Sequence, residues 1–176
     1  TPASYFHLLR RQAYNRPRKP LVVFTPKSML RLRAAQSDVE DFTTGTFREV
    51  IPDDSVDPAD VDRVLICAGK VYYDLVAERD RSGDTATAII RFEQLYPLAH
   101  DAIRESLAPF DGAEVVWVQE EPLNQGAWSR MSLSLPQVIG QTVGVVSRPA
   151  SASPASGLAS RHTAEQADLV RRAFER

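Results

Sequence analysis

The chain has 176 residues, 43% hydrophobic and 25% charged, which is enough to fold around a sizeable core. No apolar run approaches the roughly 20 residues that span a bilayer, and no signal peptide follows Thr1. The single cysteine, Cys67, excludes an internal disulfide and is typical of a reducing cytoplasm. The chain does not begin with Met, which indicates an engineered or processed piece. We therefore expect a cytoplasmic protein with no membrane partner.

The net charge of −2 conceals an asymmetry along the chain. Residues 1–37 carry eight Arg or Lys and no Asp or Glu, whereas the remainder carries 13 basic and 23 acidic residues, a net −10. A basic segment is typical of nucleic-acid or phosphate binding. Few stacking aromatics lie between these basic residues, and a solvated helix face is the simpler explanation. We expect no nucleic-acid partner.

The first 33 residues predict one helix and one strand. Thr1 caps the helix, Pro2 suits its first turn, and the proline-containing stretch 16–20 ends it. Residues 21–24, Leu-Val-Val-Phe between two prolines, predict a buried strand. No other strand lies nearby, so residues 1–33 are predicted to be the tail of an upstream α/β domain of the pyrimidine-binding type. The apolar stripe expected to face inward from the helix consists of Tyr5, Leu8, Leu9 and Ala13.

Residues 34–60 are predicted to be a linker, with a short strand at 46–51. From Val61 onward, apolar strands alternate with amphipathic helices, which predicts an α/β domain at 61–176 with a mostly parallel sheet flanked by helices. The expected strands are 64–68, 85–92, 114–119 and 141–147. The expected helices are 71–79, 101–107 and one from about Ala164, capped by Thr163 and Gln166; residues 125–135 are ambiguous, and 149–157 predict an irregular surface loop.

The sequence lacks the usual motifs of a catalytic or metal site. The three histidines are far apart, and one cysteine does not complete a zinc site. Gly69-Lys70 lacks the rest of a phosphate-binding P-loop, and neither a dinucleotide fingerprint nor a nucleophile elbow is present. We therefore expect no catalytic, cofactor-binding or metal-binding residue in this chain.

Four residues remain as candidates for special chemistry. Glu120 and Glu121 directly follow an expected strand, at the end where α/β proteins bind ligands, and repulsion between two adjacent carboxylates favours protonation of one of them. The simpler alternative is that one caps a turn or pairs with an Arg. Trp128 is either a ligand platform or a buried or interface aromatic. Lys70 begins a helix that could hold an anion, although a solvated lysine is commoner.

Five sequence blocks resemble, in order, the C-terminal part of the E1 component of 2-oxoglutarate dehydrogenase, with its transketolase-like C-terminal domain. They are YFHLLRRQ at 5–12 with PLVVFTPKSMLR at 20–31, CAGKVYYDL at 67–75, RFEQLYP at 91–97, QEEPLNQGAW at 119–128 and RPASASP at 148–154. Pyruvate dehydrogenase and transketolase C-terminal domains carry looser versions, so the equivalent domain of another 2-oxoacid dehydrogenase is the close alternative. Ser147 stands where the family leads us to expect Gly.

The resemblance implies an oxidoreductase of the tricarboxylic acid cycle in the bacterial cytoplasm. Such an enzyme decarboxylates 2-oxoglutarate with thiamine diphosphate and Mg²⁺ and passes the succinyl group to a lipoyl arm of its E2 partner, dihydrolipoyl succinyltransferase. It works as a homodimer, and its cofactor and catalytic residues lie upstream of Thr1, in the thiamine-binding domains. This segment alone is therefore expected to be inactive and to serve dimer assembly.

The resemblance also implies a regulatory alternative. Some family members bind acetyl-CoA or AMP near the junction of these domains, which makes Arg10, Arg11 and Lys27 candidate phosphate contacts. In that case the segment is chiefly a regulatory nucleotide-binding module.

The block at 119–128 is our candidate subunit interface. Pro122 and Gly126 favour a turn at the end of the expected strand. Trp128 is of the large anchor type found in interface cores, and polar side chains in such a loop satisfy buried backbone groups. The alternative is that the block only closes the core of its own domain. The expected interface residues are Glu120, Glu121, Asn124, Gln125 and Trp128.

Overall fold

The computed structural model describes residues 1–16 and 18–176, and the chain divides into two compact units, Thr1–Glu49 and Val50–Arg176. The boundary falls inside the predicted linker 34–60. Residues 39–43 of that linker form a helix, and residues 50–51 form the edge strand of the sheet. The linker is therefore not a uniform connection, because each half joins the unit next to it.

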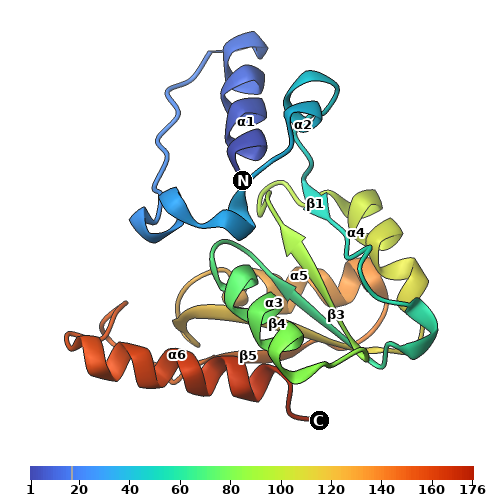
Figure 1. The fold of residues 1–176 in the computed structure, drawn as a ribbon, viewed down its shortest axis with the longest axis vertical. Helices are drawn as coiled ribbons and strands as arrows, with labels where there is room; N and C mark the ends of the chain where they lie inside the picture. The colour runs from blue at the N-terminus through green and yellow to red at the C-terminus, as the bar shows by residue number, and fades with distance from the viewer. Residues whose placement is uncertain (17) are drawn as a thin grey trace. The chain divides into compact units, whose positions relative to one another are not determined.

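The first unit is helical (Figure 1). It contains α1 (Pro2–Tyr14) and α2 (Val39–Thr43), with two short 3-10 helices, Lys27–Arg31 and Arg33–Ala35, between them. The predicted cap is confirmed, since Thr1 Oγ1 accepts a hydrogen bond from the Ser4 backbone N–H at 3.2 Å. The helix-ending role predicted for residues 16–20 includes Pro17, which lies outside the described residues.

Two expectations for the first unit are wrong. Residues 21–24 form no strand, and Phe24 is 94% exposed. A strand needs a neighbour for its backbone N–H and C=O groups, and the described part of this unit offers none. The expected inward stripe of α1 is also mostly exposed; the buried residues of the helix are instead Ala3 and His7. His7 is held by a 2.7 Å hydrogen bond between its Nε2 and the Asp41 carbonyl oxygen.

The second unit is an α/β domain, as predicted. Its sheet has the strand order β1-β3-β2-β4-β5, in which β2 to β5 run parallel and β1 pairs antiparallel with β3. The strands are β1 (Val50–Ile51), β2 (Arg63–Cys67), β3 (Thr87–Phe92), β4 (Glu114–Pro122) and β5 (Gly144–Arg148). The helices are α3 (Val71–Ser82), α4 (His100–Leu107), α5 (Trp128–Ile139) and α6 (Ala159–Ala173), with 3-10 turns at Pro58–Asp60 and Ala108–Phe110.

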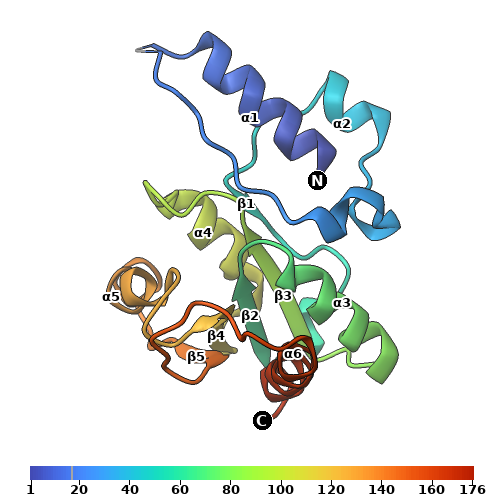
Figure 2. The same cartoon turned by 90° about the vertical axis from the view of Figure 1, so that its left-hand side faces the viewer.

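Helices cover both faces of this sheet. Figure 2 shows α3 and α6 on one side of the strands and α4 and α5 on the other. The side chains of β2 alternate between the two layers: Val64 and Ile66 pack with α4 and α5, whereas Leu65 and Cys67 pack with α3 and α6. A strand buried on both faces is apolar at every position, which is why its sequence shows a continuous run instead of alternation.

The last helix begins earlier than predicted. Helix α6 starts at Ala159, so Thr163 lies within it and its hydroxyl donates to the Ala159 carbonyl at 3.0 Å. The capping box predicted at Thr163 and Gln166 is therefore wrong; the Gln166 side chain instead donates to Asp74 on α3 at 2.8 Å. The ambiguous residues 125–135 end in helix α5, and residues 149–157 contain neither helix nor strand, as expected.

Candidate functional site

The carboxyl ends of β2 and β4 form the topological switch point of the sheet. The two strands are neighbours, yet β2 leads into α3 on one face and β4 leads into α5 on the other. Such a divergence opens a crevice at the strand ends, where α/β proteins usually bind ligands. An ion pair spans it, because the Lys70 ammonium after β2 donates to the Glu120 carboxylate on β4. Lys70 also lies 4.0 Å from Asp74. The lysine and the glutamate therefore neutralise each other in this chain.

Gln119 organises the segment that follows. Its side chain is buried, and its Oε1 accepts from Trp117 Nε1 at 3.0 Å and from the Trp128 backbone N–H at 2.9 Å. Its Nε2 donates to the carbonyl oxygens of Pro122 at 3.1 Å and Gln125 at 2.7 Å. One carboxamide thus joins β4, the turn after it and the start of α5. An irregular buried turn needs such partners for its backbone groups.

Gly126 is required at the closest point of this turn. Its φ of +67° lies in the left-handed region, where a side chain is strained. A Cβ at this position would also lie 2.9 Å from the Cβ of Glu121 and 3.1 Å from the Gln119 carboxamide. The glycine therefore permits both the backbone conformation and the approach of Gln119.

Asn124 and Gln125 fix a second loop. Asn124 Oδ1 accepts from the Ser151 backbone N–H at 3.0 Å, and its Nδ2 donates to the Ser151 carbonyl at 3.1 Å. Gln125 Nε2 donates to the same carbonyl at 2.8 Å. Within the chain, these two predicted interface residues tie the segment 119–128 to the loop 149–157.

Trp128 packs beside the switch point, next in sequence to Ala127, which lines a hollow of about 380 Å³. The indole is half-buried and packs against the core of its own unit. The hollow contains an exposed aromatic ring, that of Tyr96, with the Arg130 guanidinium 5.8 Å from its centre. The lining residues are Ala68, Leu95, Tyr96, Trp117, Gln119, Glu121, Gly126, Ala127, Arg130 and Met131. Glu121 reaches this hollow, whereas Glu120 is paired with Lys70, so the two adjacent carboxylates do not share one site.

A buried charge cluster lies at the end of β3. Arg91 forms an ion pair with Glu93 at 2.7 Å, donates to the Tyr73 hydroxyl at 3.2 Å and lies 4.5 Å from the centre of the Tyr72 ring. Burial raises the pKa of the neighbouring Cys67 thiol to about 12. Cys67 is therefore a protonated core residue at neutral pH and has no nucleophilic thiolate.

The predicted effector residues lie in the first unit and are only partly brought together. Arg10 and Arg11 line an open hollow of about 330 Å³, in which the Arg11 guanidinium lies 3.9 Å from the centre of the Phe47 ring. The other lining residues are His7, Tyr14, Thr46, Phe47 and Glu49. Lys27 is exposed and does not line this hollow.

No group of three or more His, Cys, Asp or Glu that could hold a metal ion occurs among the described residues. The described part of the chain also contains no helix with both the length and the apolar character needed to cross a membrane.

Three residues that form these hydrogen-bond networks, Gln119, Arg91 and Ser151, are not among the candidates that the sequence indicates. The first two are polar residues in or beside apolar strands. A polar residue in a strand that is otherwise buried is a usable signal, because burial without hydrogen bonds is costly. Ser151 acts through its backbone, for which the sequence contains no signal.

Known proteins resemble this chain closely. The family model described as 2-oxoglutarate dehydrogenase C-terminal matches residues 36–174. The 2-oxoglutarate dehydrogenase E1 component of Haemophilus influenzae is 46% identical over 174 residues, which cover 97% of this chain and 19% of that protein. The E1 component of the same name from Cupriavidus necator is 47% identical over 178 residues, and the one from Azotobacter vinelandii is 45% identical over 181 residues. Each of these two matches covers 99% of this chain and 19% of the relative.

The chain thus spans about a fifth of the length of the curated relatives it matches. The match to the family model covers most of the chain, including the entire sheet with its switch point. The chain therefore belongs to the 2-oxoglutarate dehydrogenase C-terminal family.

Proposed function

We propose that this chain is the C-terminal part of the E1 component of a bacterial, cytoplasmic 2-oxoglutarate dehydrogenase. The observation that carries the proposal is the family match over residues 36–174, together with relatives of that name at 45–47% identity. The full-length enzyme decarboxylates 2-oxoglutarate with thiamine diphosphate and Mg²⁺ and passes the succinyl group to a lipoyl group of its E2 partner.

The cofactor contacts belong to another part of that enzyme. As the family resemblance implies, we expect the residues that hold thiamine diphosphate and Mg²⁺ to lie in the thiamine-binding domains of the full-length enzyme. The full-length protein should release CO₂ from 2-oxoglutarate when thiamine diphosphate and Mg²⁺ are supplied, and the 176-residue chain should not. Turnover by the 176-residue chain alone would contradict the proposal that the cofactor contacts lie elsewhere in the enzyme. A full-length protein that prefers pyruvate would contradict the proposal that 2-oxoglutarate is the substrate.

The segment 119–128 serves assembly of the E1 homodimer. Gln119 holds it in one conformation, and apolar side chains are exposed in and beside it: Leu123 is 41% exposed and Tyr96 is 78% exposed. Because Asn124 and Gln125 bind Ser151 within the chain, they shape this surface, and Trp128 with its apolar neighbours makes the main contact with the second copy.

Trp128→Ala in the full-length enzyme tests this role. Loss of an interface anchor costs about 2 kcal/mol or more, which raises the dimer dissociation constant by about 30-fold. Sedimentation velocity across a dilution series measures it, with Leu158→Ala as the control for loss of an exposed apolar side chain outside the segment. Dimers of undiminished affinity, or a variant that is generally unfolded, would rule out the interface role.

The first unit suggests a second function, regulation by a nucleotide-like effector. The cationic and aromatic lining of its hollow, with Arg10, Arg11 and Phe47, suits a phosphorylated ligand with a planar ring. Titration calorimetry of the full-length enzyme with acetyl-CoA and with AMP decides it. Absence of heat with both ligands at concentrations up to about 1 mM would exclude binding in the useful range.

A further inference from the structure

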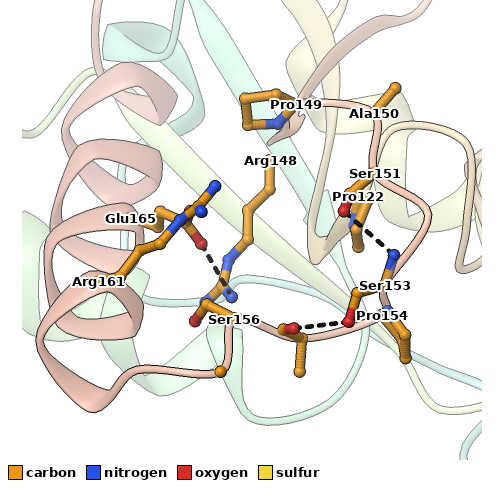
Figure 3. A pocket seen from close by; sticks show the side chains of 12 residues that line it. Pro122, Arg148, Pro149, Ala150, Ser151, Ser153, Pro154, Ser156, Arg161 and Glu165 are labelled. Atoms are coloured by element: carbon orange, nitrogen blue, oxygen red, sulfur yellow. Dashed lines mark hydrogen bonds and ion pairs between the residues drawn. The ribbon is translucent and has the colours of Figure 1, made fainter.

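A separate hollow of about 260 Å³ lies between the end of β5, the loop 149–157 and helix α6. Figure 3 shows the Arg148 side chain entering it from the end of β5, with Arg161 and Glu165 on the helix side and Ser151 and Ser153 on the loop side. The loop is held in place from outside by the bonds of Asn124 and Gln125 to Ser151. The hollow is therefore bounded by fixed elements.

Arg148 brings a buried cation to this hollow. Its side chain is 7% exposed. Its Nη2 donates to Gln166 Oε1 at 3.0 Å and lies 3.1 Å from His162 Nδ1. Its other nitrogens are less well satisfied, because Nη1 lies 3.5 Å from Glu165 Oε2 and the buried Nε has no hydrogen-bond partner among the described residues. A guanidinium has five N–H donors, so this one retains capacity for a further acceptor.

One carboxylate serves two arginines here. Glu165 Oε1 accepts from Arg161 Nε at 2.6 Å, while its Oε2 faces Arg148. Arg161 is 71% exposed, and in the described part of the chain Glu165 is its only partner. Two guanidiniums against one carboxylate leave an excess positive charge beside the hollow. Because bidentate pairing with oxyanions is the characteristic chemistry of arginine, this excess favours an anion.

Two further features near the hollow favour an anion. Ser156 Oγ is buried without a hydrogen-bond partner among the described residues. Helix α6 begins just after it, with no side-chain cap and no acidic residue in its first turn. Free N–H groups at a helix start add to the attraction of an anion, although by themselves they do not make a site.

We propose that this hollow binds a small phosphate-type oxyanion, held by Arg148 and Arg161, and that Glu165 competes with it for the same two guanidiniums. The volume limits the ligand, since pockets for drug-sized molecules measure roughly 300–1,000 Å³. The site accepts inorganic phosphate or the phosphate group of a small monoester. It is formed by the second unit alone and does not depend on the enzymatic function proposed above.

Titration calorimetry of the 176-residue chain with inorganic phosphate tests the site at constant ionic strength, with glycerol phosphate in a parallel titration. Tighter binding of the monoester would identify an esterified ligand, and tighter binding of inorganic phosphate a free one; either result supports the site. Arg161→Ala should weaken binding about 10-fold or more, and Glu165→Gln should strengthen it several-fold because the competitor is removed. Circular dichroism verifies that the variants are folded.

Arg171→Ala is the matched control, because Arg171 is an exposed arginine at the other end of the same helix, paired with Asp168 and Glu175. It should leave the affinity unchanged. The proposal is overturned if Arg161→Ala and Arg171→Ala weaken binding equally, since the effect is then one of general charge. The proposal is also overturned if Glu165→Gln fails to strengthen binding, or if neither this variant nor the wild type binds phosphate at about 10 mM ligand.

Discussion

The two units of the chain differ in how they bury their apolar residues. In the second unit, β2 and β3 are buried at every position and two layers of helices cover the sheet. In the described part of the first unit, only Ala3, His7 and Ala35 are buried, while Tyr14, Phe24 and Leu30 are each more than three-quarters exposed. The second unit therefore has a complete core of its own. The first unit has large apolar side chains like those of a core, but in its described residues many of them are exposed.

The contrast extends to charged groups. In the second unit, the Asp53 carboxylate is buried and binds the Arg79 guanidinium, the Ile89 backbone N–H at 2.7 Å and the Ser55 backbone N–H at 3.1 Å. In the first unit, the basic residues Arg10 and Lys27 are exposed. A buried carboxylate with all these partners requires a rigid surrounding structure, so the bonding of Asp53 indicates that the second unit is well ordered around it.

Truncation of the sheet core should give the largest effect. Leu65 is fully buried at the centre of β2, so Leu65→Ala removes packing on one face of the sheet. We expect the free energy of unfolding of the second unit to fall by about 2–5 kcal/mol, as measured by urea denaturation. Leu30→Ala in the first unit, where the side chain is 81% exposed, should change the free energy of unfolding by less than about 0.5 kcal/mol. Equal effects would erase the distinction between the units.

Asp53→Asn should give the next largest effect, a loss of about 3 kcal/mol, because it leaves the Arg79 guanidinium buried without a counter-charge. Burial raises the pKa of Asp53, but hydrogen bonds from Ser55, Ile89 and Arg79 outweigh it and lower the pKa below its ordinary value. Asp54→Asn, at an exposed neighbour, is the control and should be nearly silent.

The lowered pKa also predicts a pH dependence. The ionised carboxylate stabilises the fold fully above the unfolded pKa of about 3.9, and this contribution is lost as the pH falls through the lower folded value. Thermal unfolding followed between neutral pH and about pH 3 should therefore show a steeper acid loss for the wild type than for Asp53→Asn. Parallel curves would mean that Asp53 is not the group responsible.

Gly45→Ala should give the smallest and most local effect. A Cβ there would lie 2.3 Å from the Asp41 carbonyl oxygen and 3.2 Å from His7 Nε2, which disrupts the hydrogen bond between α1 and α2. We expect amide exchange in α1 to accelerate about 10-fold while the amides of the sheet are unaffected. Gly157→Ala, where a Cβ meets no atom within 4 Å, is the control. Any change in amide exchange in the sheet strands of the Gly45 variant would show that the effect is not confined to the first unit.

The sequence by itself determined the α/β class, the strands and most helices of the second unit, because a sheet covered on both faces requires continuous apolar strands separated by amphipathic helices. It also determined the family, through five blocks that lie in the expected order along the chain. The predicted start of α6 is wrong because Thr and Gln are equally compatible with a helix cap and with the helix interior. In the structure both Thr163 and Gln166 lie inside α6, and Gln166 donates to Asp74 on α3.

Tertiary structure alone decided the organisation of the site. The sequence marks Asn124 and Gln125 as polar loop residues, but their partner Ser151 lies 26 or 27 positions away and contributes only its backbone. It places Glu120 next to Glu121, but in the structure Glu120 pairs with Lys70 across the crevice between β2 and β4, whereas Glu121 lines the hollow that also contains Tyr96. Residues 21–24 have the composition of a strand and remain unpaired, because strand formation requires hydrogen bonds from a neighbouring segment, and no local pattern specifies one.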